Sequence, residues 1–159
     1  MSDPYLVLKW VHILSSTVLF GTGIGTAFQL VWAMRRRDPR QVHGVAAGVV
    51  TADWLFTTPA GIAQPVTGLW LAALAGYGWG EPWLLLTYGL YLLAFLCWAP
   101  VLHLQIRIRD LAAQAVAEGT ALPPAALRAY RIWFMLGWPA FAALLLVFWL
   151  MVTKPPLWG

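Results

Sequence analysis

Four long apolar stretches dominate the chain and restrict the folds that it can adopt. In chain order they run at about residues 5–34, 42–75, 83–104 and 132–152. Each is long enough to cross the hydrocarbon core of a bilayer, which takes roughly 20 residues of helix. Of the 159 residues, 61% are hydrophobic and only 10% are charged, far fewer charges than soluble domains carry. We therefore predict an all-α, integral membrane four-helix bundle that forms a single domain over residues 1–159.

The basic residues are distributed unevenly between the segments that join these stretches. The segments after the first span and before the fourth contain Arg35, Arg36, Arg37, Arg40, Arg107, Arg109, Arg128 and Arg131. The opposite side has only Lys9 and Lys154. Under the positive-inside rule this bias places both termini on the non-cytoplasmic side of a bacterial cytoplasmic (inner) membrane. The net charge of +4 is thus interpreted as a topology signal, and nucleic acid is not expected as a partner.

Several common chemistries have no sequence signature here. Cys97 is the only cysteine, which excludes an intrachain disulfide and a thiolate metal cluster. The chain also lacks a phosphate-binding glycine loop, an HExxH zinc motif and a serine nucleophile elbow. ATP-driven and hydrolytic functions are therefore not supported.

Asp53 is a lone carboxylate inside the second predicted span. An ionisable residue within a membrane is by default a functional hypothesis, and it should be protonated or paired. Asp53 therefore either relays protons or anchors a structural network with Thr57 and Trp54.

Two prolines interrupt the same span. Pro59 and Pro65 each remove a backbone donor and should kink the helix. We expect Thr57, Thr58 or water to satisfy the carbonyls that are freed. A bent helix with polar residues at the bend is expected to face protein rather than lipid.

His12 is the one histidine expected inside hydrocarbon, about 10 Å below Tyr5 at the rise of an α-helix. A neutral imidazole is a good ligand for haem iron. The alternative is a histidine that only holds helices together. The residues after it are small or hydroxylated, which should allow a helix or a flat ligand to approach closely; they are Ser15, Ser16, Thr17, Gly21, Gly23 and Gly25.

A second metal ligand should lie at the depth of His12. Met151 near the end of the fourth span is one candidate, because His–Met ligation of haem is well known, although its spacing alone favours an ordinary packing methionine. Gln64 is a candidate partner for the histidine, or else a hydrogen bond between helices. His43 and His103 fall at the opposite side of the membrane.

Lys9 lies one turn from His12 on the same helical face, and Lys154 falls at the same membrane surface. Two cations around one pocket would suit the carboxylates of haem or of a porphyrinogen. The alternative is that both lysines reach to the lipid headgroups.

Four segments together carry a family resemblance over nearly the whole chain. They are LKWVHILSSTVLFGTGIGTAFQ, ADWLFTTPAGIAQPVTGLWLAALAGY, CWAPVLHLQIRIRDLA and RIWFMLGWPAFAALLLVFWLMVTKP. The chain resembles a family of small bacterial predicted integral membrane proteins (domain of unknown function 2269). It is more distantly similar to the J-type protoporphyrinogen oxidases, which bind haem b.

The second resemblance implies specific roles. His12 matches the histidine thought to ligate haem, Met151 stands for a methionine ligand, and Lys154 matches a terminal Lys-Pro motif. The Arg-Asn-Glu motif of those enzymes is replaced by RIWFMLGWP, which argues against the porphyrinogen substrate more than against haem.

The leading hypothesis is therefore a membrane b-type haem protein with an oxidoreductase or electron-transfer role, passing electrons toward a quinone or a respiratory partner. In it His12 and Met151 ligate the metal, Gln64 and Lys154 help to bind the cofactor, and Lys9 and Asp53 are catalytic. The alternative is a non-enzymatic membrane subunit or small transporter with a polar path around Asp53. Both hypotheses are compatible with a homo-oligomer.

Overall fold

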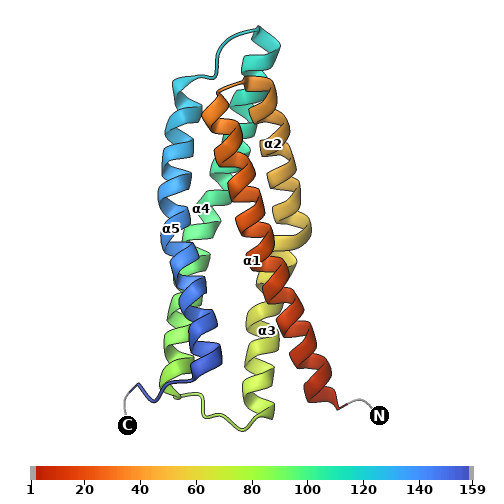
Figure 1. Ribbon diagram of the computed structural model, residues 1–159, viewed down its shortest axis with the longest axis vertical. Helices are drawn as coiled ribbons and strands as arrows, with labels where there is room; N and C mark the ends of the chain where they lie inside the picture. Colours follow the sequence, from red (N-terminus) through yellow and green to blue (C-terminus); the bar gives the residue numbers. More distant parts are fainter. Residues whose placement is uncertain (1–2, 158–159) are drawn as a thin grey trace.

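Residues 3–157 are described by a computed structural model, which is helical throughout its membrane-length segments (Figure 1). The elements are α1 (Pro4–Arg36), α2 (Pro39–Ala52), the π-helical segment η1 (Asp53–Thr57), α3 (Thr58–Leu74), α4 (Pro82–Glu118) and α5 (Pro124–Thr153). Because α2, η1 and α3 run on without a break, residues 3–157 contain four helices that are long and apolar enough to span a membrane. The described residues contain no strand. The predicted all-α bundle with four spanning helices is confirmed.

Proline begins each of the four long helices, at Pro4, Pro39, Pro82 and Pro124. Its fixed φ suits the first helical turn, and the missing N–H would have no partner there. Asp38 caps the second helix, since its carboxylate accepts a hydrogen bond from the backbone N–H of Arg40.

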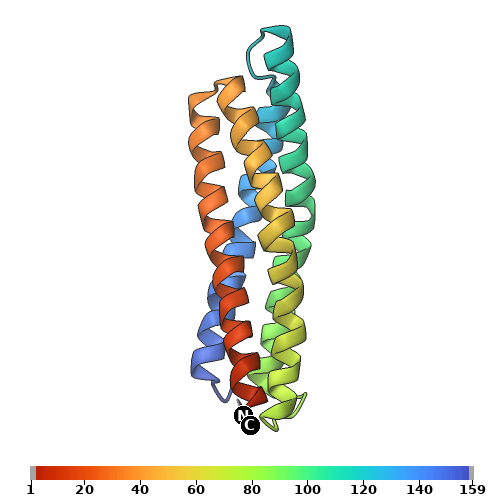
Figure 2. The same cartoon turned by 90° about the vertical axis from the view of Figure 1, so that its right-hand side faces the viewer.

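The two ends of the bundle carry different turns, loops and helix ends (Figure 2). We call the end that carries the α1–α2 turn and the α4–α5 loop the basic end, since the eight arginines belong to the segments around it. The terminal end carries the start of α1, the α3–α4 turn and the end of α5. At the basic end, α4 continues to Glu118 and α5 already begins at Pro124, so both helices extend beyond the apolar stretches 83–104 and 132–152.

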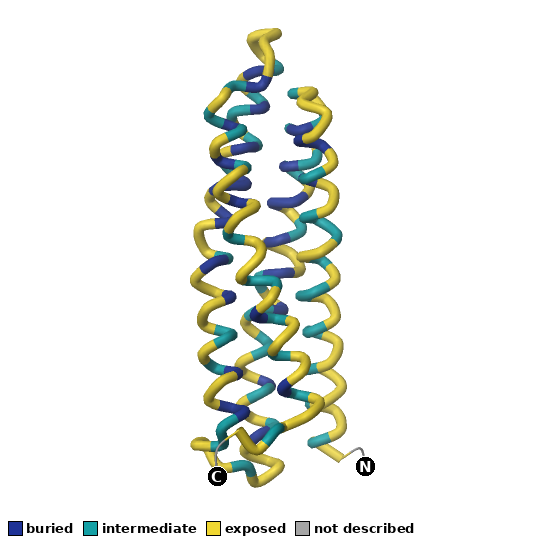
Figure 3. The backbone as a smooth tube through the Cα atoms, turned by 60° about the vertical axis from the view of Figure 1, so that its left-hand side comes forward, coloured by how far each residue is buried: buried dark blue, intermediate teal, exposed yellow. Residues whose placement is uncertain are grey.

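The packed core lies mainly toward the basic end (Figure 3). It is formed by Leu30, Ala33, Met34, Val42, Ala46, Val49, Val101, Leu104, Ile108, Ala112, Leu122, Ala126, Ala129 and Trp133. A smaller terminal-end cluster consists of Ala72, Trp83, Leu84 and Leu150. Toward the terminal end, α1 packs on α3 and α4 packs on α5, whereas α1 makes few contacts with α5.

The second membrane helix changes its winding at Asp53. The backbone N–H of Thr58 donates to the carbonyl of Asp53, five residues back, which is the π-helical pattern. Pro59, directly after this bond, has no N–H to continue the α-helical ladder.

Pro65 leaves the carbonyl of Gly61 without its usual donor four residues later. The hydroxyl of Tyr91 on α4 donates to this oxygen at 2.5 Å. Thr57 instead donates to the side chain of Asp53, and the Thr58 hydroxyl has no partner. The expectation that threonines of the same helix satisfy the freed carbonyls is therefore wrong at this position, because a neighbouring helix does so.

Candidate functional site

A cavity of about 470 Å³ lies between the helices and is partly open to the outside. It is lined by α1, by η1 and α3, by α4 and by α5. Phe20 of α1 contacts Phe141 and Phe148 of α5, with ring centroids 5.2 and 5.3 Å apart. Phe20 and Phe141 themselves line the cavity, so this aromatic contact borders it where α1 and α5 meet.

The cavity wall is mostly apolar, with many aromatic side chains, and Asp53 supplies the one carboxyl group among its described lining residues. The aromatic lining residues are Phe20, Tyr91, Phe95, Trp98, Trp133, Phe134, Trp138 and Phe141. Apolar cavities with a few convergent polar groups are typical of sites for small molecules.

The Asp53 side chain is only 3% exposed. Its Oδ1 accepts a hydrogen bond from the Thr57 hydroxyl at 2.7 Å, whereas Oδ2 has no partner. The side chain of Gln105, 4% exposed, lies near the same carboxyl, and its Oε1 is also without a partner. Asp53, a residue of the cavity wall, therefore has one carboxyl oxygen without a hydrogen-bond partner.

Three further lining residues have polar atoms without partners. These atoms are Thr58 Oγ1, Trp98 Nε1 and Trp133 Nε1. Since buried polar groups in native proteins are nearly always hydrogen-bonded, their concentration around one cavity marks it as the candidate site.

His12 lies in a second polar group, between α1 and α3 and outside the lining of the cavity. The Thr67 hydroxyl donates its one proton to the carbonyl of Ala63 at 2.6 Å. His12 Nδ1 lies 2.7 Å from this hydroxyl. With the Thr67 proton on the Ala63 carbonyl, this contact takes a ring N–H on Nδ1, and a neutral imidazole of that tautomer has its free lone pair on Nε2.

Gln64 also lies beside His12, as its depth predicts, but it does not contact the ring. Its Nε2 donates to the backbone carbonyl of His12 at 2.8 Å and to the hydroxyl of Ser15. It therefore joins α3 to α1 and does not orient the imidazole.

Gly68 brings the backbone of α3 against the His12 ring, because a Cβ at this position would lie 3.2 Å from Cε1. The glycines of α1 behave differently from the expectation. A Cβ at Gly21, Gly23 or Gly25 would meet nothing within 4 Å. Close approach within the chain comes from α3, and Gly23 lines the cavity instead.

The structure does not gather the other predicted haem-site residues around His12. Met151 packs against the terminal-end cluster. Lys154 Nζ donates to the Tyr77 hydroxyl at 2.8 Å and lies 5.5 Å from the centre of the Trp83 ring. Lys9 is exposed, with Nζ 5.9 Å from the centre of the Tyr5 ring. Within residues 3–157, no group of three or more His, Cys, Asp or Glu side chains is placed to hold a metal ion.

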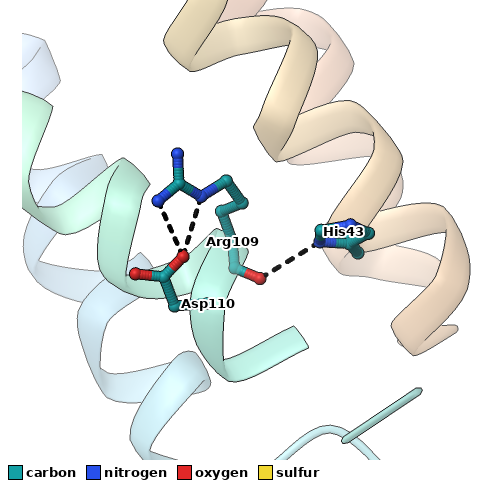
Figure 4. Close-up of polar contacts among 3 residues, drawn as sticks. All are labelled: His43, Arg109 and Asp110. Atoms are coloured by element: carbon teal, nitrogen blue, oxygen red, sulfur yellow. Dashed lines mark hydrogen bonds and ion pairs between the residues drawn. The ribbon is translucent and has the colours of Figure 1, made fainter. Parts of the chain in front are cut away.

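At the basic end, His43 connects α2 to α4 (Figure 4). Its Nδ1 lies 3.3 Å from the backbone oxygen of Arg109, whose side chain forms an ion pair with Asp110 at 2.8 Å. This arrangement places His43 in interhelical packing.

The sequence analysis did not identify Gln105, Trp98 or Trp133 as site residues. A signal was present, since Trp98, Val101 and Gln105 follow at intervals of three and four residues and so share one face of a helix. That face lines the cavity together with Asp53.

Of the comparisons with known proteins, one finds a match, to a protein family. No curated protein and no solved structure matches the chain. A family model described as "Predicted integral membrane protein (DUF2269)" matches residues 6–155, which is nearly the whole chain. The protein is an integral membrane protein with four candidate spans, and it belongs to the DUF2269 family of predicted integral membrane proteins.

Proposed function

We propose that the protein binds a small lipid-soluble molecule in the cavity at Asp53 and serves in the membrane as a binding or transport subunit. The observation that carries this proposal is the set of unpartnered polar atoms around the cavity. A buried polar group without a partner costs roughly 1–3 kcal/mol. A ligand that supplies the missing partners would offset this cost and occupy the apolar volume at the same time.

Two glycines of α1 provide a matched test. Gly23→Leu places a side chain where the cavity is open, whereas Gly21→Leu adds the same side chain at an exposed position outside the lining. Both changes raise helix propensity equally. Three naphthalene probes of similar size are titrated calorimetrically into nanodiscs: 1-naphthylmethylamine, 1-ethylnaphthalene and 1-acetylnaphthalene. We expect saturable binding of at least one probe, weakened at least about tenfold by Gly23→Leu.

The Gly21→Leu protein should bind as the wild type does. If none of the three probes binds wild-type protein above the level of empty nanodiscs, or if both variants weaken binding alike, the cavity is not a ligand site and the proposal fails.

A second candidate function is haem binding at His12, favoured by the contact between Nδ1 and the Thr67 hydroxyl, which holds the ring by this one nitrogen. His12 would supply one ligand to the haem iron, whereas Met151 packs against the terminal-end cluster. Haem, when bound, would supply one-electron chemistry toward a quinone or a respiratory partner, with porphyrinogen oxidation as one version. Thr67 and Gly68 would orient the imidazole.

This candidate predicts a reduced-minus-oxidised haem spectrum in membranes from cells supplied with haem. His12→Ala should abolish the absorbance bands, whereas His43→Ala, which removes a histidine at the other end of the bundle, should keep them. A wild-type protein that remains colourless under these conditions rules the candidate out.

We also propose that the basic end faces the bacterial cytoplasm, because eight arginines belong to it and two lysines to the terminal end. Single cysteines in a Cys97→Ser background test this orientation. Gly80→Cys in the α3–α4 turn should react with a membrane-impermeant maleimide in intact cells. Thr120→Cys in the α4–α5 loop should react only after permeabilisation, and the reverse pattern would invert the topology.

A further inference from the structure

The geometry points to a protonated hydrophobic amine as the ligand of the cavity, with its ammonium group at Asp53 and its apolar body against the aromatic wall. This inference rests on the proposed function and specifies its substrate class. Two observations support it: the unpartnered oxygens beside the cavity need hydrogen-bond donors, and the wall has a carboxyl group, that of Asp53, but no basic group.

The carboxyl group of Asp53 has no basic partner on the wall. Among the described lining residues there is no lysine, arginine or histidine, and the polar groups beside the carboxyl are the neutral side chains of Thr57 and Gln105. A carboxylate buried in this way is stabilised most by a cation that comes with the ligand. Asp53 is thus a recognition group for positive charge.

The unpartnered acceptors favour an N–H donor. Asp53 Oδ2 and Gln105 Oε1 need donors, and an ammonium group carries up to three. A quinone carbonyl only accepts hydrogen bonds, so it would satisfy the N–H groups of Trp98 or Trp133 and leave the carboxylate unpaired. Because hydrogen bonds to charged groups are worth more than neutral ones, the acceptors at Asp53 decide the ligand class.

The wall suits an apolar cation and not a bare metal ion. Tryptophan, tyrosine and phenylalanine faces attract ammonium groups, and the cavity is lined by all three residue types. Ca²⁺ and Mg²⁺ take six or more oxygen ligands, whereas Asp53 is the one carboxyl residue among the described lining residues. A hydroxyl or carbonyl on the amine would further satisfy Trp98 and Trp133.

The naphthalene probes separate the inference from the proposed function on which it rests. 1-Naphthylmethylamine is protonated at pH 7, 1-ethylnaphthalene has nearly the same shape without charge, and 1-acetylnaphthalene has a carbonyl acceptor. We expect wild-type protein in nanodiscs to bind the amine roughly 10- to 100-fold more tightly than the ethyl probe, as one charge-assisted hydrogen bond provides.

Asp53→Asn keeps the shape of the side chain and removes its charge, so the preference for the amine should fall to within about threefold while the ethyl probe binds as before. Asp110→Asn makes the same chemical change at an exposed residue of α4, and it should retain the full preference. Retained binding of the ethyl probe also shows that the Asp53→Asn protein is folded.

Each of the other outcomes overturns the amine inference, and one of them also overturns the proposed function. Equal saturable binding of the amine and the ethyl probe, or tighter binding of the acetyl probe, overturns the amine inference and leaves the cavity as a ligand site. A preference that survives Asp53→Asn also overturns it. Absence of binding by all three probes overturns the inference and the proposed function together.

Discussion

Replacing Asp53 with leucine is expected to stabilise the ligand-free protein by about 1–3 kcal/mol. The substitution removes a buried carboxylate of which one oxygen has no partner, and the adjoining cavity accommodates the larger side chain. The Thr57 hydroxyl can then donate to a backbone carbonyl one turn back, as Thr51 and Thr87 do. Denaturation by SDS in mixed micelles measures the change.

Asp53→Asn is the comparison for this measurement, since its side-chain oxygen still accepts from Thr57 while a neutral amide of the same shape replaces the carboxyl group. A gain in stability combined with a loss of amine binding would mark Asp53 as a residue kept for function. A loss of stability in the leucine variant would instead identify Asp53 as an anchor of a structural network with Thr57, the other interpretation of this carboxylate.

Ile108→Ala is expected to destabilise the protein by about 2–5 kcal/mol. Ile108 is fully buried in the core at the basic end, where α2, α4 and α5 meet. Its neighbours Arg107 and Arg109 indicate that this part of α4 lies outside the hydrocarbon. Its side chain is therefore exposed to water after unfolding and loses both burial and packing when it is shortened.

Leu96→Ala on the same helix is the matched control. Leu96 is 60% exposed within the apolar part of α4, where lipid solvates it in either state. We expect a change below about 0.5 kcal/mol in the same SDS titration. Equal effects of the two substitutions would contradict a bundle held together at its basic end.

The fold was largely predictable because the bilayer requires long apolar helices, and apolar length is visible in a sequence. The start of α5 was less visible. Residues 124–131 include two arginines and thus have low hydropathy, but Ala126 and Ala129 face the core. Small residues can bury a helix face against a neighbour without a strong hydrophobic signal.

The membrane depth of the candidate site residues could be predicted from the sequence, but the direction in which their side chains point could not. Counting residues along the helices placed Gln64 at the level of His12, and the two residues are joined by a hydrogen bond. The same counting selected Met151, which packs into the terminal-end cluster. Which way a side chain points around its helix depends on local winding and on neighbouring helices, and neither follows from residue counts.

The π-helical segment between α2 and α3 is equivalent to one residue inserted into a regular helix. Each residue turns an α-helix by about 100°, so every side chain after Thr57 is rotated relative to α2. The rotation aligns Gly61 with Tyr91 and Thr67 with His12. A related chain lacking one residue between Asp53 and Thr57 would keep its hydropathy profile and lose both pairings, so alignments of such chains should be examined for single-residue gaps at this position.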